Sequence, residues 1–402
     1  MNIVGIVAEY NPFHNGHFYH LQKAKEKAQA DHSVAIMSSN FVQRGEPGIF
    51  SKWQRAEMAV ANGIDLVIEL PVLFSSRSAY YFAFGSVYSL IKSRVITHLA
   101  FGVEADDMDS LKKIAGFLTF ESDSFKNTLH YFLKDGHSYP KARELAILEY
   151  FPEIPFTLNQ PNVILAINYL KVLHQYQSSI TPVSVERLGT YHGKKPIGNI
   201  AGATFVRNLL EANNSEYKYY LTPETNKVID SILNLGFKPV FLKDFDQQLM
   251  FLLRSTTKEK LMVHPGIKEG LENKILGTLF NAHHISEVIK GSNSKRYTET
   301  RIKRTLVEIL LGLTYQDNLL TPQYLRILAF NDKGREILKE MKKESTLPVV
   351  TKFADFYHQA GTDAKRIMDL DLAATNIYSQ IQNASPYNAY NQEFTNSPLF
   401  LK

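Results

Sequence analysis

Two histidines in the stretch EYNPFHNGHFYH, residues 9–20, have the type and spacing that phosphate chemistry needs. His14 and His17 lie three residues apart, on either side of an Asn-Gly pair in which Gly16 permits a tight backbone. Imidazole N–H groups at this spacing can donate hydrogen bonds to the same anion. Such donors suit the negative charge that builds up around phosphorus during nucleotidyl transfer. The pattern therefore predicts a catalytic, phosphate-binding role for both histidines.

Two other interpretations of the pair stay open at this point. Imidazole is a common metal ligand, and a histidine near a helix start is often only a polar surface residue. Glu9 is the only acidic residue in the stretch, and no third histidine stands at metal-site spacing. We therefore expect no metal site here. The residue pattern alone gives no role to His20, which lies one turn further on.

The segments around the pair alternate between short apolar runs and runs of helical periodicity. The expected strands span residues 3–8, 33–39, 65–71 and 96–102, and the expected helices span 17–30, 51–63 (with Ser51 as N-cap) and 78–93. This alternation predicts the α/β fold class, with a Rossmann-like, doubly wound parallel sheet. Both histidines would then lie at the carboxyl edge of the sheet, where ligands bind and a helix N-terminus attracts phosphate.

Strand signals become sparse after the fourth strand. Residues 106–175 have helical periodicity and form a predicted insertion, after which a strand pattern returns at 180–189. We place the end of the α/β domain near residue 212. Residues 213–402 are predicted to form a mainly α-helical C-terminal domain, with one strand signal at 238–242 and a loosely ordered tail after Pro386.

The composition is ordinary for a soluble globular protein of 402 residues, with 44% hydrophobic residues and a net charge of +5. The absence of cysteine excludes disulfides, thiolate metal sites and a cysteine nucleophile. No apolar run approaches the roughly 20 residues of a membrane span, and the first residues show no signal peptide. We expect a cytoplasmic protein with no membrane partner. Its mildly basic charge permits a polyanionic partner.

Longer stretches of the chain resemble a known family. GIVAEYNPFHNGHFYHLQKA resembles the H-x-G-H signature of the HIGH-superfamily nucleotidyltransferases. With MSSNFVQRGEP, KWQRAEMAVANGIDLVIELP, QPNVILAINYL and SKRYTETRIKR, it resembles the bacterial tRNA(Met) cytidine acetate ligase family along essentially the whole chain. The resemblance implies a ligase that activates acetate with ATP, accompanied by Mg²⁺, as acetyl-adenylate. The acetyl group then passes to N4 of the wobble cytidine of elongator tRNA(Met), and AMP and pyrophosphate are released.

The resemblance also implies site residues. His14, His17 and Arg207 would be catalytic, and residues 1–212 would form the ATP-binding domain. The implied ATP contacts are Val7, Glu9, Tyr10, Asn11, Pro12, Phe13, Gly16, His20, Gly102, Asn162, Arg187, Leu188 and Thr204. Three positions depart from the family pattern. The family often has Gly at the position of Ser39, commonly has Ser at the position of Val103, and typically has a hydroxyl residue at the position of Gly202.

The positions of several of these residues next to predicted strands and helices also suggest roles for them. Gly102 follows a strand and lets the backbone approach a nucleoside, and Asn162 is a good N-cap at a helix start. Thr204 and Arg207, in NIAGATFVRNLLE, share one face of a predicted helix start, so the arginine can neutralise leaving phosphates. Arg207 could instead be a solvated helix residue. The loop residues Asn40, Gln43 and Arg44 are predicted substrate or ribose contacts, or an ordinary loop after the second strand.

The nucleic-acid signal is the basic stretch SKRYTETRIKRTLVEILLGL. It carries five cations in residues 294–304 against one acid, Glu299, with an apolar helical face behind them. We predict tRNA contacts at Lys295, Arg296, Arg301 and Arg304, with Tyr297 able to stack on a base. A solvated charged face is the alternative.

Two other functions would share the N-terminal site. An adenylyltransferase of a small metabolite would leave the helical C-terminal half with its basic stretch unexplained. A non-catalytic RNA-binding protein with a nucleotide pocket would have no use for the two histidines and Arg207.

Overall fold

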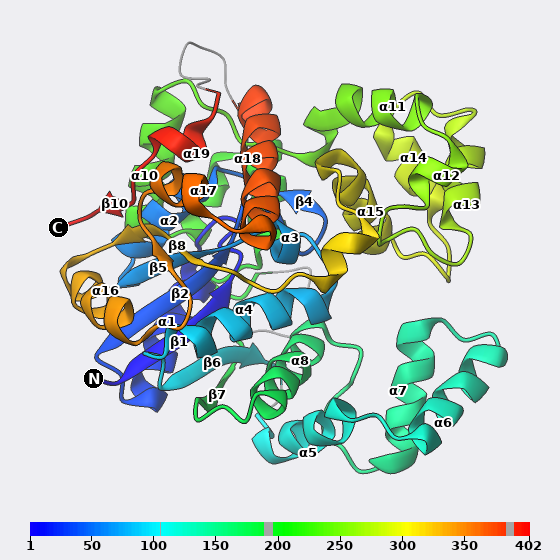
Figure 1. Ribbon diagram of the computed structural model, residues 1–402, viewed down its shortest axis with the longest axis horizontal. Helices are drawn as coiled ribbons and strands as arrows, with labels where there is room; N and C mark the ends of the chain where they lie inside the picture. The colour runs from blue at the N-terminus through cyan, green and yellow to red at the C-terminus, as the bar shows by residue number, and fades with distance from the viewer. Residues whose placement is uncertain (105, 189–195, 383–389) are drawn as a thin grey trace.

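The computed structural model describes residues 1–104, 106–188, 196–382 and 390–402. Its centre is an eight-stranded sheet in the order β10-β8-β5-β2-β1-β6-β7, with β9 paired to β8 (Figure 1). The strands are β1 (Ile3–Ala8), β2 (His32–Ser38), β5 (Leu66–Leu70), β6 (His98–Val103), β7 (Thr181–Glu186), β8 (Leu325–Phe330), β9 (Val349–Val350) and β10 (Leu399–Phe400). A separate hairpin joins β3 (Phe41–Val42) to β4 (Glu46–Pro47).

The five strands that residues 1–188 contribute to the central sheet pair in parallel, which confirms the predicted α/β sheet. Strand β2 shows why its sequence is a continuous apolar run, because both of its faces are covered. Val34 and Ile36 belong to a core that includes α4 (Ala79–Ser93) and α8 (Pro161–Gln175). The alternating residues Ala35 and Met37 belong to the core on the other face, with α1 (Asn15–Ala28) and α2 (Lys52–Ala61). Ser51 caps α2, as predicted.

The region between β6 and β7 is helical. It consists of α5 (Met108–Thr119), α6 (Asp123–Lys134), α7 (Tyr139–Tyr150) and α8. Helices α6 and α7 project away from the sheet, while α8 packs against α4 and α5 (Figure 1). The short α3 (Val72–Ser75) follows β5, and α9 (Ala203–Glu211) follows β7. None of the described helices is long and apolar enough to cross a membrane.

The chain beyond residue 212 is mainly helical, but it also returns to the sheet. The boundary that we placed near residue 212 does not mark the end of the sheet, because β8 pairs antiparallel with β5 and β10 pairs with β8. The predicted strand at 238–242 is wrong. That segment makes one strand-like contact, from Val240 N to Ile49 O, and then enters a short 3-10 helix. Pairing partners so distant in sequence leave no local signal, so a short run such as β8 is easily missed.

The helices after residue 212 form two groups (Figure 1). One lobe contains α11 (Asp246–Arg254), α12 (Lys258–Leu261), α13 (Leu271–Leu279), α14 (Ile285–Ser292) and α15 (Glu299–Leu311). The others lie near the sheet: α10 (Pro223–Asn234), α16 (Asp332–Glu344), α17 (Phe353–Gln359), α18 (Thr362–Gln382) and α19 (Gln392–Thr395). The 3-10 helices are η1 (Ser215–Tyr220), η2 (Leu242–Phe245) and η3 (Tyr315–Leu319).

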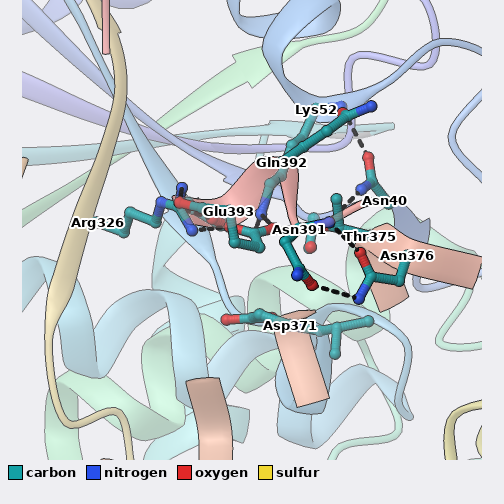
Figure 2. Close-up of polar contacts among 12 residues, drawn as sticks. Asn40, Lys52, Arg326, Asp371, Thr375, Asn376, Asn391, Gln392 and Glu393 are labelled. Carbon is teal, nitrogen blue, oxygen red and sulfur yellow. Dashed lines mark hydrogen bonds and ion pairs between the residues drawn. The ribbon is translucent and has the colours of Figure 1, made fainter. Parts of the chain in front are cut away.

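The described part of the tail, residues 390–402, is ordered by contacts with the core, contrary to our expectation. Glu393 of α19 is fully buried and accepts hydrogen bonds from Lys52, Arg326 and Thr375 (Figure 2). Glu69 of β5 pairs with Lys52 and Arg326 in the same cluster. Charged side chains are rarely buried unless they are paired, so this network fixes where the tail lies.

Candidate active site

The stretch between β1 and α1 is held by the side chains around it. Tyr10 and Phe13 are buried, and the Asn11-Pro12 peptide bond is cis. Asn11 Oδ1 accepts from Ile49 N at 2.6 Å, and Glu9 Oε1 accepts from Gln43 N at 3.0 Å. These contacts fix the entry to α1, where both histidines lie.

The start of α1 sets the protonation of the two rings. His14 is the N-cap, and its Nδ1 accepts from Gly16 N at 3.1 Å. His17 Nδ1 accepts from His14 N at 3.3 Å. An Nδ1 that accepts a hydrogen bond carries no proton, so in each neutral ring the proton lies on Nε2. The rings stack with their centroids 3.7 Å apart. The backbone thus selects the tautomer in which both rings can donate to a phosphate oxygen.

The electrostatics keep these rings neutral at pH 7. Burial, helped by the charge of Arg187, lowers the pKa of His14 to about 3. Burial lowers the pKa of His17 well below its usual value, and His14 and Arg187 lower it further. The two rings therefore act as uncharged donors, and Arg187 supplies positive charge beside them.

His20 interacts electrostatically with His17 and Arg187, a role that its residue pattern alone did not indicate. Burial and then Arg187 lower its pKa to about 4, and a hydrogen bond to the Phe101 backbone opposes them. Its Nε2 is buried with no hydrogen-bond partner among the described residues. The predicted ATP contact of His20 stays a prediction, and its orphaned nitrogen is compatible with it.

Gly102 and Arg187 meet where β6 and β7 end. A Cβ atom at Gly102 would lie 3.2 Å from Arg187 Cγ and 3.5 Å from Cδ. Gly102 therefore makes room for the arginine side chain, a role that the sequence did not indicate. Leu188, which follows Arg187, is 48% exposed at the edge of the described residues.

Asn162 has a partner that the sequence analysis missed. Its side chain donates to Glu104 Oε1, and Glu104 Oε2 is buried without a hydrogen-bond partner among the described residues. The N-cap of α8 is Gln160, so the N-cap reading of Asn162 is wrong. Because Pro161 can begin the helix without an N–H donor, the helix starts earlier than we expected. Glu104 directly follows β6, and that position at the carboxyl edge was the available signal.

The segment before α9 covers the start of α1. Asn15 Nδ2 donates to Asn199 O at 2.8 Å and to Tyr219 O at 3.2 Å. Gly202 is the N-cap of α9 and gives no side-chain cap, and Thr204 is exposed in the first turn. This arrangement brings the second predicted phosphate element beside the first.

Arg207 is not a solvated helix residue. Its side chain is 12% exposed and reaches β4, where Nη1 donates to Pro47 O at 3.1 Å and Nη2 lies 3.4 Å from Glu46 Oε2. Burial lowers its pKa, and the charges of Glu46 and Glu9 oppose this shift. The arginine whose charge acts on both histidines is Arg187.

The loop after β2 is mostly structural. Asn40 is fully buried, accepts from Lys52 N at 2.9 Å and donates to Thr375 Oγ1 at 3.0 Å. Its predicted substrate contact is therefore wrong, because both ends of its amide are already used inside the core. Gln43 holds Glu9 through its backbone, and Arg44 is exposed.

The basic stretch divides into two parts. Lys295 and Arg296 precede α15 and are exposed. Arg301 pairs with Glu269 at 2.9 Å. Burial lowers the pKa of Arg304, and the charge of Glu308 partly opposes this shift. The Tyr297 hydroxyl donates to Glu269 O and the ring is 8% exposed, so the prediction that Tyr297 stacks on a base is wrong.

Metal-binding residues do not gather in the described ranges. No group of three or more His, Cys, Asp or Glu side chains there is placed to hold a metal ion. The residues that do meet are two neutral imidazole donors, a third histidine and Arg187. This combination of donors and positive charge can bind a polyphosphate and stabilise charge on it.

Comparison with known proteins agrees with this geometry. Residues 1–393 match the family model described as HIGH Nucleotidyl Transferase, so the chain belongs to that family. It is 37% identical to the tRNA(Met) cytidine acetate ligase of Acetivibrio thermocellus, over the whole of both chains. It is 40% identical to that of Thermoanaerobacter sp., over 94% of this chain and 95% of the relative. The resemblance found in the sequence is thus confirmed.

Solved structures give the same result. The Thermotoga maritima TmcAL is 33% identical, and its apo form superposes over the whole of both chains with a TM-score of 0.95. Its form bound with alpha-thio ATP superposes over the whole of both chains with a TM-score of 0.92. The predicted fold class is therefore confirmed.

Proposed function

We propose that this protein is an ATP-dependent ligase that acetylates N4 of the wobble cytidine of elongator tRNA(Met). The observation that carries the proposal is the pair of neutral imidazoles with their protons on Nε2, at the carboxyl end of β1 beside Arg187. The names of its relatives support the tRNA substrate. The alpha-thio ATP of the Thermotoga structure supports ATP as the activating substrate. Such a reaction would take place in the cytoplasm, where its tRNA is.

The reaction has two steps. An acetate oxygen attacks the α-phosphorus of ATP, a new P–O bond forms, and the bond to the leaving pyrophosphate breaks. The cytidine N4 amine then attacks the acetyl carbonyl, AMP leaves, and the amine loses a proton. Acetate is already ionised at pH 7, so the first step needs no general base. The site's tasks there are to hold the reactants together and to stabilise charge.

The residues divide these tasks. His14 and His17 donate from Nε2 to phosphate oxygens, and Arg187 adds positive charge beside them. Arg207 would neutralise the leaving phosphates from the α9 side. Mg²⁺ would arrive with ATP, held mainly by phosphate oxygens and water, and would neutralise phosphate charge. Gly102, Asn162 and Glu104 would hold the nucleoside where β6 and β7 end.

The deciding experiment is ATP–pyrophosphate exchange with a panel of carboxylates, with and without tRNA. Exchange that depends on acetate, followed by transfer of labelled acetate to tRNA(Met), is the expected result. Exchange that occurs only with a nucleotide or another small metabolite would establish an adenylyltransferase instead. ATP binding without any exchange would identify a non-catalytic RNA-binding protein.

Arg207→Ala is expected to reduce ATP use more than tRNA binding. Loss of one charge-stabilising donor at a phosphoryl centre costs about 100-fold in rate. The rate of acetate-dependent exchange and the tRNA affinity are measured in the same protein. Arg335→Ala, an exposed arginine on α16, is the matched control. An unchanged exchange rate in Arg207→Ala would remove this arginine from the site.

Replacement of Lys295, Arg296, Arg301 and Arg304 by glutamine is expected to weaken tRNA binding. A variant that makes fewer phosphate contacts releases fewer counterions when it binds tRNA, so the salt dependence of its affinity is flatter. Lys295→Gln with Arg296→Gln should carry most of the effect, because these two side chains are exposed and precede the helix. Affinity is measured at several salt concentrations, with acetyl-adenylate formation as a parallel assay.

The control for this experiment lies on α16. Lys339→Gln with Lys342→Gln removes the same charge from two exposed positions on that helix. An equal loss of affinity in both double variants would show a general charge effect rather than a tRNA site. Loss of adenylate formation in the fourfold variant would mean that this region contributes to the ATP site.

A further inference from the structure

The β3–β4 hairpin lies between the candidate ATP site and the basic helix α15. Gly45 lies in the turn of this hairpin and has a φ of +74°. A Cβ atom at this position would collide with the backbone of Lys303 and Arg304. The next residue, Glu46, points its carboxylate between two cations from distant parts of the chain. The hairpin therefore links two regions to which we assign different substrates.

Glu46 pairs with both cations at once. Its Oε2 lies 3.4 Å from Arg207 Nη2, and its Oε1 lies 2.7 Å from Lys303 Nζ. All three side chains are between 12% and 24% exposed, so water screens these charges only in part. Burial lowers the pKa of Lys303, but the contacts with Glu46 and Glu299 outweigh it and raise the pKa. The lysine is therefore charged.

A carboxylate beside a triphosphate site has two opposing effects. It fixes the guanidinium of Arg207, which also donates to Pro47 O, and so reduces the freedom that this side chain must lose when it meets phosphate. It also repels the phosphates. Lys303 offsets that repulsion, because its charge lies against the same carboxylate.

We propose that Glu46 is a positioning residue that aims Arg207 at ATP, and that Lys303 of α15 neutralises the charge this requires. This inference rests on the role proposed above for Arg207. A lysine in the region assigned to tRNA would then affect ATP use without touching ATP.

The test is a double-mutant cycle on exchange without tRNA, with equilibrium ATP binding measured in the same proteins. Glu46→Gln should lower kcat/KM for ATP about tenfold, mainly in kcat, because Arg207 loses its anchor. Lys303→Met should also lower it about tenfold, mainly through KM, because the carboxylate then repels ATP unopposed. The double variant should lose only about tenfold, because the charge that Lys303 neutralises has gone.

The matched control is Glu299→Gln. Glu299 also pairs with Lys303, at 2.9 Å, but it is more exposed and makes no contact with Arg207. Glu299→Gln should leave ATP use unchanged. If the substitutions acted through a general loss of α15 structure, ATP use would fall in Glu299→Gln as well. If Glu46→Gln does not fold, Lys303→Met against Glu299→Gln carries the test, and equal ATP affinity in the two would overturn the proposal.

Arg207→Ala separates the two levels of the argument. If this variant is impaired while Glu46→Gln and Lys303→Met are normal, only the role of Glu46 falls. If Arg207→Ala exchanges like the wild type, the roles of Arg207 and Glu46 both fall. An additive loss of about 100-fold in the double variant would also overturn the proposal, because it would make the two residues independent.

Discussion

His14→Asn and His17→Asn each lower acetate-dependent ATP–pyrophosphate exchange by about 100-fold or more, because each removes one donor to the charge that develops on the phosphates. These replacements are preferable to alanine. His14 is the N-cap of α1, and loss of a cap costs about 1 kcal/mol of stability by itself. Asparagine can still cap the helix but does not place a donor at the position of Nε2.

The measurement must separate catalysis from folding. Thermal unfolding of each variant should stay close to that of the wild type, and His130→Ala, an exposed histidine on α6, should leave both exchange and stability unchanged. Because burial lowers the pKa of His14 to about 3 and that of His17 well below its usual value, both rings are neutral at pH 7, and raising the pH above 7 should not change their donor role. Near-normal exchange in both variants would remove the histidines from the catalytic site.

Local patterns predicted the part of the fold in which contacts are close in sequence. The strands and helices of the first hundred residues alternate with clear periods, and Ser51 caps α2 as its sequence indicates. The placement of His14 and His17 followed from the strand–helix junction alone. Their tautomer did not, because it depends on which backbone N–H reaches each Nδ1.

Contacts between distant segments were beyond such patterns. Strand β8 becomes a strand by pairing with β5, some 260 residues earlier in the chain. The sequence alone indicates a loop residue at Asn40, but its side chain donates a hydrogen bond to Thr375 of α18. The sequence likewise indicates a stacking ring at Tyr297, but its hydroxyl donates a hydrogen bond to the backbone oxygen of Glu269. Glu46 lies in the stretch MSSNFVQRGEP, but the sequence does not show that it pairs with Arg207 and Lys303, which come from distant parts of the chain.

The tail also depends on contacts between segments that are distant in sequence. Lys52, Glu69, Arg326 and Glu393 come from four separate parts of the chain, and each side chain is at most 4% exposed. Burial alone would raise the pKa of Glu69, but Lys52 and Arg326 outweigh it and lower the pKa. The network is therefore ionic, and its two cations share two carboxylates.

Glu393→Gln is expected to destabilise the protein by about 3 to 5 kcal/mol, the usual cost of breaking a buried ion pair from one side. Lys52 Nζ lies 2.5 Å from Glu393 Oε1 and 2.6 Å from Glu69 Oε1, so the variant leaves two buried cations with one carboxylate. Glutamine keeps the size of the side chain, so the loss measures charge rather than packing. Urea-induced unfolding, followed by circular dichroism, gives the free energy.

Thr395→Ala, an exposed position in the same short helix, is the control and should change stability by less than about 0.5 kcal/mol. The tail should also become more accessible to protease in Glu393→Gln, because this carboxylate attaches α19 to the core. The loss should be smaller when Arg326 is replaced as well, since that variant leaves one cation, Lys52, with one carboxylate, Glu69. Stability equal to that of the wild type in Glu393→Gln would mean that the tail is held by its apolar contacts alone, and that the ionic network contributes nothing to the fold.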